Sequence, residues 1–215
     1  MDLKAVVRRI ARLDGGDHPV GLDEFGNVTI SKGLPDYARL CAAGKLFAID
    51  MHAGTAKAPV VAVPTTSPEW GLYNYSPNET MVVLEAACTI KSGTQGLGLA
   101  LMGAAALGKQ TEVTADYAST IKSCLDGSKD VPDVYLGNNP TLLGGTPAWH
   151  VLANDPGNLI ASVNIGSGLV AKVDGKLQAR PNGGMAAFEV VGPTGTAALF
   201  TVSFIIAMLD LRRKS

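Results

Sequence analysis

Short apolar runs separated by turn-forming residues are the feature that most constrains the fold of this chain. From Lys45 onward, about ten runs rich in valine, leucine, isoleucine and aromatics alternate with clusters of glycine, proline, asparagine, aspartate, serine and threonine. No long helical period separates the runs, which argues against a parallel sheet with crossover helices. The pattern therefore predicts an all-β fold, a β-sandwich or jelly roll. The predicted strands are 45–52, 58–63, 70–75, 80–91, 97–107, 147–153, 168–174, 176–180, 185–192 and 197–209, and residues 114–125 fit either one helical turn or a further strand.

Two of these predicted strands are apolar or small on both faces. In 197–209, the odd-numbered positions share one face and the even-numbered positions share the other, and neither face is charged. The run 97–107 has the same character, and such strands must be covered on both sides. Neighbouring subunits are one way to do this, and a charged fraction of only 17% also indicates an oligomer. We interpret 197–209 as a central strand, near an oligomer axis or in the inter-sheet core.

The glycines of the stretch 164–184, NIGSGLVAKVDGKLQARPNGG, raise the question of a phosphate-binding loop. Such a loop needs a helix directly after its glycines, whereas IGSG is followed by residues that alternate with period two. Asp174-Gly175 between two alternating arms predicts a hairpin, and Asn182-Gly183 predicts another turn. The glycines are therefore predicted to be bends in a sheet, not a nucleotide site.

Residues 1–44 are predicted to form an N-terminal arm, and residues 45–215 the β-domain. Within the arm, 25–33 suggests a short strand and 34–44 a helical turn or two. The first residues predict an amphipathic helix that ends at Gly15-Gly16. Its apolar stripe is Leu3, Val6, Val7, Ile10 and Leu13, and its basic complement is Lys4, Arg8, Arg9 and Arg12.

This helix could dock on a partner protein, lie on a membrane, contact nucleic acid or serve only a structural purpose. The formal net charge of the chain is −1, which favours a protein partner. We expect no membrane and no direct nucleic-acid partner. Charges throughout the first sixteen residues leave no apolar segment of a signal peptide, and the longest apolar run, 196–209, is short of the roughly 20 residues that span a bilayer.

No residue pattern points to catalysis, a metal or a cofactor. The nucleophile motif GxSxG is absent, and candidate carboxylates such as Asp50, Glu69 and Glu85 have no distinctive spacing. The three cysteines, Cys41, Cys88 and Cys124, are widely spaced and odd in number, which predicts free thiols in a reducing cytoplasm. The three histidines are not placed at metal-ligand spacing with them. We therefore expect a non-enzymatic protein.

Trp70, Tyr73 and Tyr75 form the one aromatic cluster with a possible binding role. Aromatic rings stack on sugar faces, so the three residues are a candidate glycan-binding platform. The alternative is that they anchor a sandwich core or an oligomer interface, as large aromatic residues commonly do.

Three segments, 64–77, 80–103 and 165–211, together resemble virion proteins of tailed bacteriophages. More narrowly, PTTSPEWGLYNYSP and the strands that follow resemble trimeric β-sandwich or jelly-roll capsid decoration (cement) proteins and head fibres. The similarity spans residues 45–211. It lies in the character of the apolar runs and turns and in the order of the predicted strands, and it includes no diagnostic motif. It implies a homotrimer on the capsid exterior of the virion, made in the host cytoplasm, with the N-terminal arm bound to the major capsid protein. A carbohydrate- or receptor-binding fibre domain and a jelly-roll major capsid protein are the alternatives.

Overall fold

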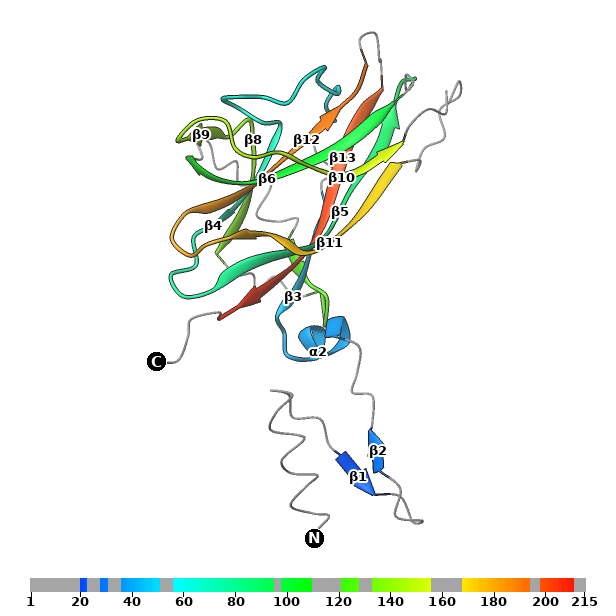
Figure 1. The fold of residues 1–215 in the computed structure, drawn as a ribbon, viewed down its shortest axis with the longest axis vertical. Helices are drawn as coiled ribbons and strands as arrows, with labels where there is room; N and C mark the ends of the chain where they lie inside the picture. Colours follow the sequence, from blue (N-terminus) through cyan, green and yellow to red (C-terminus); the bar gives the residue numbers. More distant parts are fainter. Residues whose placement is uncertain are drawn as a thin grey trace.

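The structure is a computed structural model that describes residues 20–22, 28–30, 36–50, 56–94, 98–109, 121–127, 133–155, 168–193 and 198–210. Two antiparallel sheets pack face to face (Figure 1), so the prediction of an all-β sandwich is confirmed. Sheet I contains, in spatial order, β11 (Gly168–Ala179), β5 (Thr80–Ser92), β13 (Leu199–Leu209), β3 (Leu46–Asp50) and β7 (Ile121–Ser123). Sheet II contains β10 (His150–Asp155), β6 (Leu99–Lys109), β12 (Gly184–Val191), β4 (Trp70–Asn74) and β8 (Val134–Asn138), with β9 (Thr141–Leu143) paired to β6.

Eight of these strands pair in the nested order of one long hairpin that has been rolled up. β3 pairs with β13 and β5 with β11 in sheet I, while β4 pairs with β12 and β6 with β10 in sheet II. Successive strand pairs along this hairpin therefore alternate between the sheets. Two four-stranded sheets connected in this way form a jelly roll. β7 and β8 extend the two sheets at the edge away from β10 and β11.

The last part of the predicted arm contains a short helix, α2 (Asp36–Ala42). Gly44 follows it with φ 66°, and the amides of Gly44 and Lys45 donate to the carbonyls of Cys41 and Leu40. This is the left-handed glycine ending common at helix C-termini. The helical turn expected in 34–44 is confirmed, as is the short strand expected in 25–33, where β2 (Val28–Ile30) pairs with β1 (Val20–Leu22).

The core between the sheets is made by alternate positions of the strands. On β13, Phe200, Val202 and Phe204 point inward and are at most 2% exposed. The ring centroids of Phe204 and Phe188 of β12 lie 4.4 Å apart, so these two side chains join the two sheets. β13 is the middle strand of sheet I, which confirms its interpretation as a central strand.

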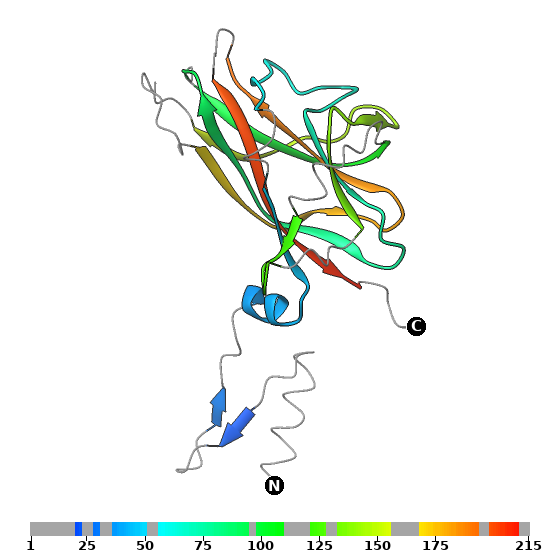
Figure 2. The ribbon, with the colours of Figure 1, turned by 180° about the vertical axis from the view of Figure 1, so that it is seen from behind.

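The outer faces of both sheets are covered in part by the chain itself. On sheet I, Tyr37 and Leu40 of α2 pack against a cluster that includes Leu46, Leu84 and Ala207 (Figure 2 shows α2 beside β3 at one end of the sandwich). On sheet II, the cover is residues 64–69, in which the carbonyl of Pro64 accepts from the indole N–H of Trp149 over 3.2 Å and the Glu69 amide donates to Glu189 over 2.9 Å. Segments of the same chain therefore bury part of the outward-facing apolar side chains of 97–107 and 197–209.

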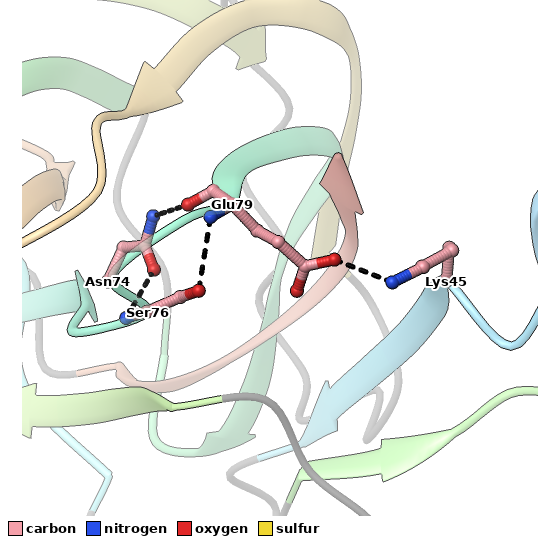
Figure 3. Close-up of polar contacts among 4 residues, drawn as sticks. All are labelled: Lys45, Asn74, Ser76 and Glu79. Atoms are coloured by element: carbon pink, nitrogen blue, oxygen red, sulfur yellow. Dashed lines mark hydrogen bonds and ion pairs between the residues drawn. The ribbon is translucent and has the colours of Figure 1, made fainter. Parts of the chain in front are cut away.

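The turns between the sheets are held by a buried asparagine at the end of β4 (Figure 3). The Asn74 amide donates to the carbonyls of Glu79 and Ala179 at 2.7 and 2.9 Å, and its oxygen accepts from the Ser76 amide at 3.0 Å. The Gly183 amide donates to the Asn74 carbonyl at 2.7 Å, which links the β4–β5 turn to the β11–β12 turn. Asn182 and Gly183 have φ values of 59° and 95°, so the turn predicted there is confirmed.

Two local predictions are wrong. Asp174 and Gly175 do adopt positive φ, 49° and 76°, but β11 continues through them as one strand. Its pairing with β5 shifts between Lys172 and Leu177, so the two residues belong to a bulge and not to a hairpin. The run 58–63 is not a strand either, because it makes only an isolated bridge through Val60 to Val191.

Candidate functional site

The predicted docking helix, with Leu3, Lys4, Val6, Val7, Arg8, Arg9, Ile10, Arg12 and Leu13, lies outside the described residues. What the structure does show is how the arm meets the β-domain. Tyr37, Leu40 and Cys41 of α2 are partly buried against the outer face of sheet I. The last part of the predicted arm is therefore packed onto the domain.

The proposed glycan platform is not assembled in this structure. Trp70 and Tyr73 are 1% and 0% exposed, and they point to opposite faces of β4. Only Tyr75, at 40% exposure, is accessible to a ligand. Neighbours on one strand point to opposite sides of a sheet, so Trp70 and Tyr73 could not have shared a surface once WGLYN formed a strand.

The aromatic group at the surface instead combines Tyr75 with Tyr135 of β8. Their ring centroids are 5.3 Å apart at an interplanar angle of 73°, and the buried Tyr73 lies behind them with its ring stacked on Tyr75 at 5.9 Å. Desolvation by burial raises the pKa of Tyr75, with a smaller contribution from Tyr135. The sequence analysis did not single out Tyr135, since the five-residue strand 134–138 was not predicted.

A buried carboxylate holds the cover of sheet II. Glu189 of β12 is fully buried, and its two oxygens accept hydrogen bonds from the amides of Glu69 (2.9 Å) and Val190 (3.2 Å). Lys57 forms an ion pair with Glu69 over 2.6 Å and donates to the side-chain oxygen of Asn139 over 2.7 Å. Desolvation raises the pKa of Glu189 to about 7, despite the two amide donors, which lower it. We call Lys57, Glu69 and Glu189 the polar clamp.

The polar clamp contains two carboxylates and an amine, but it is arranged for holding and not for turnover. Both Glu189 oxygens are engaged by backbone amides and Lys57 by Glu69 and Asn139. A proton donor or acceptor in catalysis must reach a substrate atom directly or through one water. Glu69 was one of the carboxylates considered in the sequence, and its distance of 120 positions from Glu189 hid the pairing.

A cleft opens at the edge where the two sheets end, between β10 and β11. It has a volume of about 370 Å³ and is lined by His150, Val151, Leu152, Lys172, Val173, Lys176 and Leu177. Figures 1 and 2 both show β10 and β11 beside each other along this edge. The sequence analysis did not identify this cleft, because its residues come from two strands that are not paired with each other.

Other reactive groups are dispersed over the part of the chain that the structure describes. No group of three or more histidine, cysteine, aspartate or glutamate residues there is arranged to hold a metal ion. Cys88 is buried in the core, where desolvation raises its pKa to about 11, while Cys41 and Cys124 lie partly buried beside α2. No helix among these residues is long and apolar enough to cross a membrane.

Comparison with known proteins gives no relative. No protein family model matches the chain, and no significant match is found among curated proteins or among solved structures. The functional argument therefore depends on the chain's own topology and surfaces.

Proposed function

We propose that this chain is a virion structural protein that decorates and stabilises a bacteriophage capsid as a trimeric cement protein. The observation that carries the proposal is the nested strand pairing of the jelly roll, β3 with β13, β4 with β12, β5 with β11 and β6 with β10. Viral capsid domains and lectins are among the proteins built on this architecture. The resemblance of segments 64–77, 80–103 and 165–211 to cement proteins points to the virion.

A fold by itself does not specify a function, so the surface must also suit assembly. Away from α2, the outer face of sheet I carries a row in which the small or apolar residues Val170, Ala87 and Ser203 are neighbours across three strands, and the row ends at Asp50 of β3. Val170 is 70% exposed. Interfaces between identical subunits are depleted in charge at their centres, and a flat row of this kind suits such packing.

The proposal is tested by removing residues 1–16 and measuring both oligomeric state and capsid binding. Light scattering at two concentrations should give a trimer for the full chain and for the truncated chain, since the deleted residues precede the jelly roll. Co-sedimentation with empty capsids should detect the full chain but not the truncated one. A clean monomer, or capsid binding that survives the truncation, would contradict the proposal.

A second candidate is a jelly-roll major capsid protein, which forms the shell instead of coating it. The complete eight-strand order favours it, because single jelly rolls also build capsid shells. Electron microscopy of the purified chain distinguishes the two candidates. Closed particles formed without any other protein would support the shell, whereas discrete trimers that bind preformed capsids would support decoration.

A further inference from the structure

The cleft between β10 and β11 has an apolar floor and a basic rim. Leu152, Val173 and Leu177 form the floor, and the last two are 1% and 2% exposed in the sandwich core. His150, Lys172 and Lys176 lie at the exposed rim. The volume of about 370 Å³ is within the range of about 300–1,000 Å³ that small-molecule sites occupy.

The bulge of β11 begins directly after Lys172 and includes Lys176, and both lysines line the cleft. Between Lys172 and Leu177 the strand carries more residues than the facing segment of β5, which has only Leu84 between the paired Glu85 and Val83. The extra length is accommodated by the positive φ values of Asp174 and Gly175. Strands that bulge in this way re-aim their side chains, and here Lys172 and Lys176 both come to line the cleft.

The negative charge of the bulge is directed elsewhere. Asp174 is not among the residues that line the cleft, and its carboxylate is among the groups that raise the pKa of Tyr37 in α2, after desolvation and Glu85. Lys172 lies opposite Glu85 of β5 in the register of the sheet, but Glu85 does not line the cleft, and no ion pair within the described residues includes Lys172 or Lys176. The rim therefore carries two ammonium groups with no acid among the lining residues.

Gly103 on β6 leaves room for the side chains of Leu152 and Leu177 in the floor of the cleft. A Cβ at this position would lie 2.6 Å from Leu177 Cδ1 and 2.7 Å from Leu152 Cδ1, both closer than carbon atoms can approach. Any larger residue must therefore displace the ends of these two leucines, both of which line the cleft.

We propose that the cleft binds a small amphiphilic anion, whose apolar chain lies on the leucine and valine floor and whose acidic group lies between Lys172 and Lys176. Each half of the site is weak alone. Exposed ion pairs contribute about 0–1 kcal/mol each, and apolar contact contributes about 25 cal/mol per Å² buried. Ligands that combine both features are therefore selected over ligands that have only one of them.

Titration calorimetry with the full chain tests the proposal, and octanoate is the probe. Octanoate is expected to bind saturably, whereas acetate (same charge, no chain), octanol (same chain, no charge) and octylammonium (opposite charge) are expected to bind much more weakly or not at all. Octyl phosphate in a further titration shows whether a carboxylate or a phosphate head is preferred, and either preference is consistent with the two lysines.

Two variants locate the binding. Lys172→Ala/Lys176→Ala is expected to weaken octanoate binding by about fivefold, the effect of losing two exposed ion pairs. The matched control Lys91→Ala/Lys122→Ala removes the same charge from other exposed positions of sheet I and should leave the affinity unchanged. Gly103→Ala should abolish saturable binding, with thermal unfolding by circular dichroism used to verify its fold.

The proposal is overturned if octanoate shows no saturable binding or binds no better than octylammonium. Equal losses in the lysine double variant and its control would overturn it as well, because the binding would then follow net charge and not the cleft. If Gly103→Ala does not fold, the two lysine double variants still decide the outcome, since all four lysines are exposed.

Discussion

The outer faces of the two sheets are covered by different physical means. On sheet I, α2 packs through apolar side chains, with Leu40 against a cluster that includes Leu46 and Ala207. On sheet II, residues 64–69 are fastened by the polar clamp, in which Glu189 is buried and accepts two backbone amides. The first cover depends on side-chain volume, whereas the second depends on hydrogen bonds and on a protonation state. The two faces should therefore respond to different perturbations.

The largest expected effect is the loss of the clamp carboxylate. Glu189→Ala leaves the amides of Glu69 and Val190 without their acceptor in a buried site, which should cost about 3 kcal/mol of unfolding free energy. Urea unfolding measures this value. The control Glu79→Ala removes a carboxylate whose ion pair with Lys45 is exposed, and should cost less than about 1 kcal/mol. Equal costs would show that the polar clamp does not fasten the cover.

The α2 cover should show the next largest effect. Leu40→Ala removes a partly buried side chain and should cost about 2 kcal/mol, the low end for a leucine-to-alanine change in a core. Urea titrations at pH 5 and pH 8 should give the same loss of unfolding free energy for Leu40→Ala, because the lost contact involves no ionisable group. Leu125→Ala, at a position 57% exposed, is the control and should be nearly neutral.

The pH dependence of stability should separate the two covers directly. The folded pKa of Glu189 is about 7, above its ordinary value of 4.5, so the folded state holds this proton more tightly than the unfolded state. Its contribution to stability is fully present below pH 4.5 and is lost as the pH rises to 7, at up to about 1.4 kcal/mol per pH unit. Glu189→Gln should flatten this part of the profile, while Leu40→Ala should keep it. Parallel wild-type and Glu189→Gln profiles would contradict the assignment.

The smallest expected effect is local opening at α2, measured by thiol alkylation. Cys124 lies partly buried beside α2, and its pKa is raised by desolvation and by the neighbouring Cys41. Leu40→Ala should speed the alkylation of Cys124 severalfold by loosening the helix. Cys88, which is 0% exposed, should react only on global unfolding in every variant. If Glu189→Gln speeds the alkylation of Cys124 as strongly as Leu40→Ala does, the covers of the two sheets open together, and the proposed difference between them is contradicted.

The regular parts of the fold were predictable because they depend on local pattern. The apolar run 197–209 identified β13 as a central strand, and Asn182-Gly183 identified the turn between the sheets. The Asp174-Gly175 pair shows the limit of such reasoning. Two residues that tolerate positive φ predict a break in the strand, but whether the chain then reverses or bulges depends on β5, which is distant in sequence.

The candidate sites were less predictable because they are made by long-range contacts. Glu189 is the one acid within the apolar run 185–191, and that was a usable signal for a buried carboxylate. Its partners Lys57 and Glu69 could not be found from spacing, and neither could the cleft residues of β10 and β11. Of the two interpretations of the aromatic cluster, the structure agrees with core anchoring for Trp70 and Tyr73, and strand alternation alone would have placed these two residues on opposite faces.

The nested strand order also governs when the domain can form. β13 is the last strand of the roll to leave the ribosome, yet it lies between β3 and β5, which are synthesised much earlier. Until residues 199–209 have emerged, those two strands have no neighbour to join them, and sheet I cannot close. Topologies dominated by such distant pairings fold slowly. The nascent chain therefore exposes the facing edges of β3 and β5 throughout synthesis, and this interval is when the chain is most vulnerable to aggregation and most dependent on chaperones.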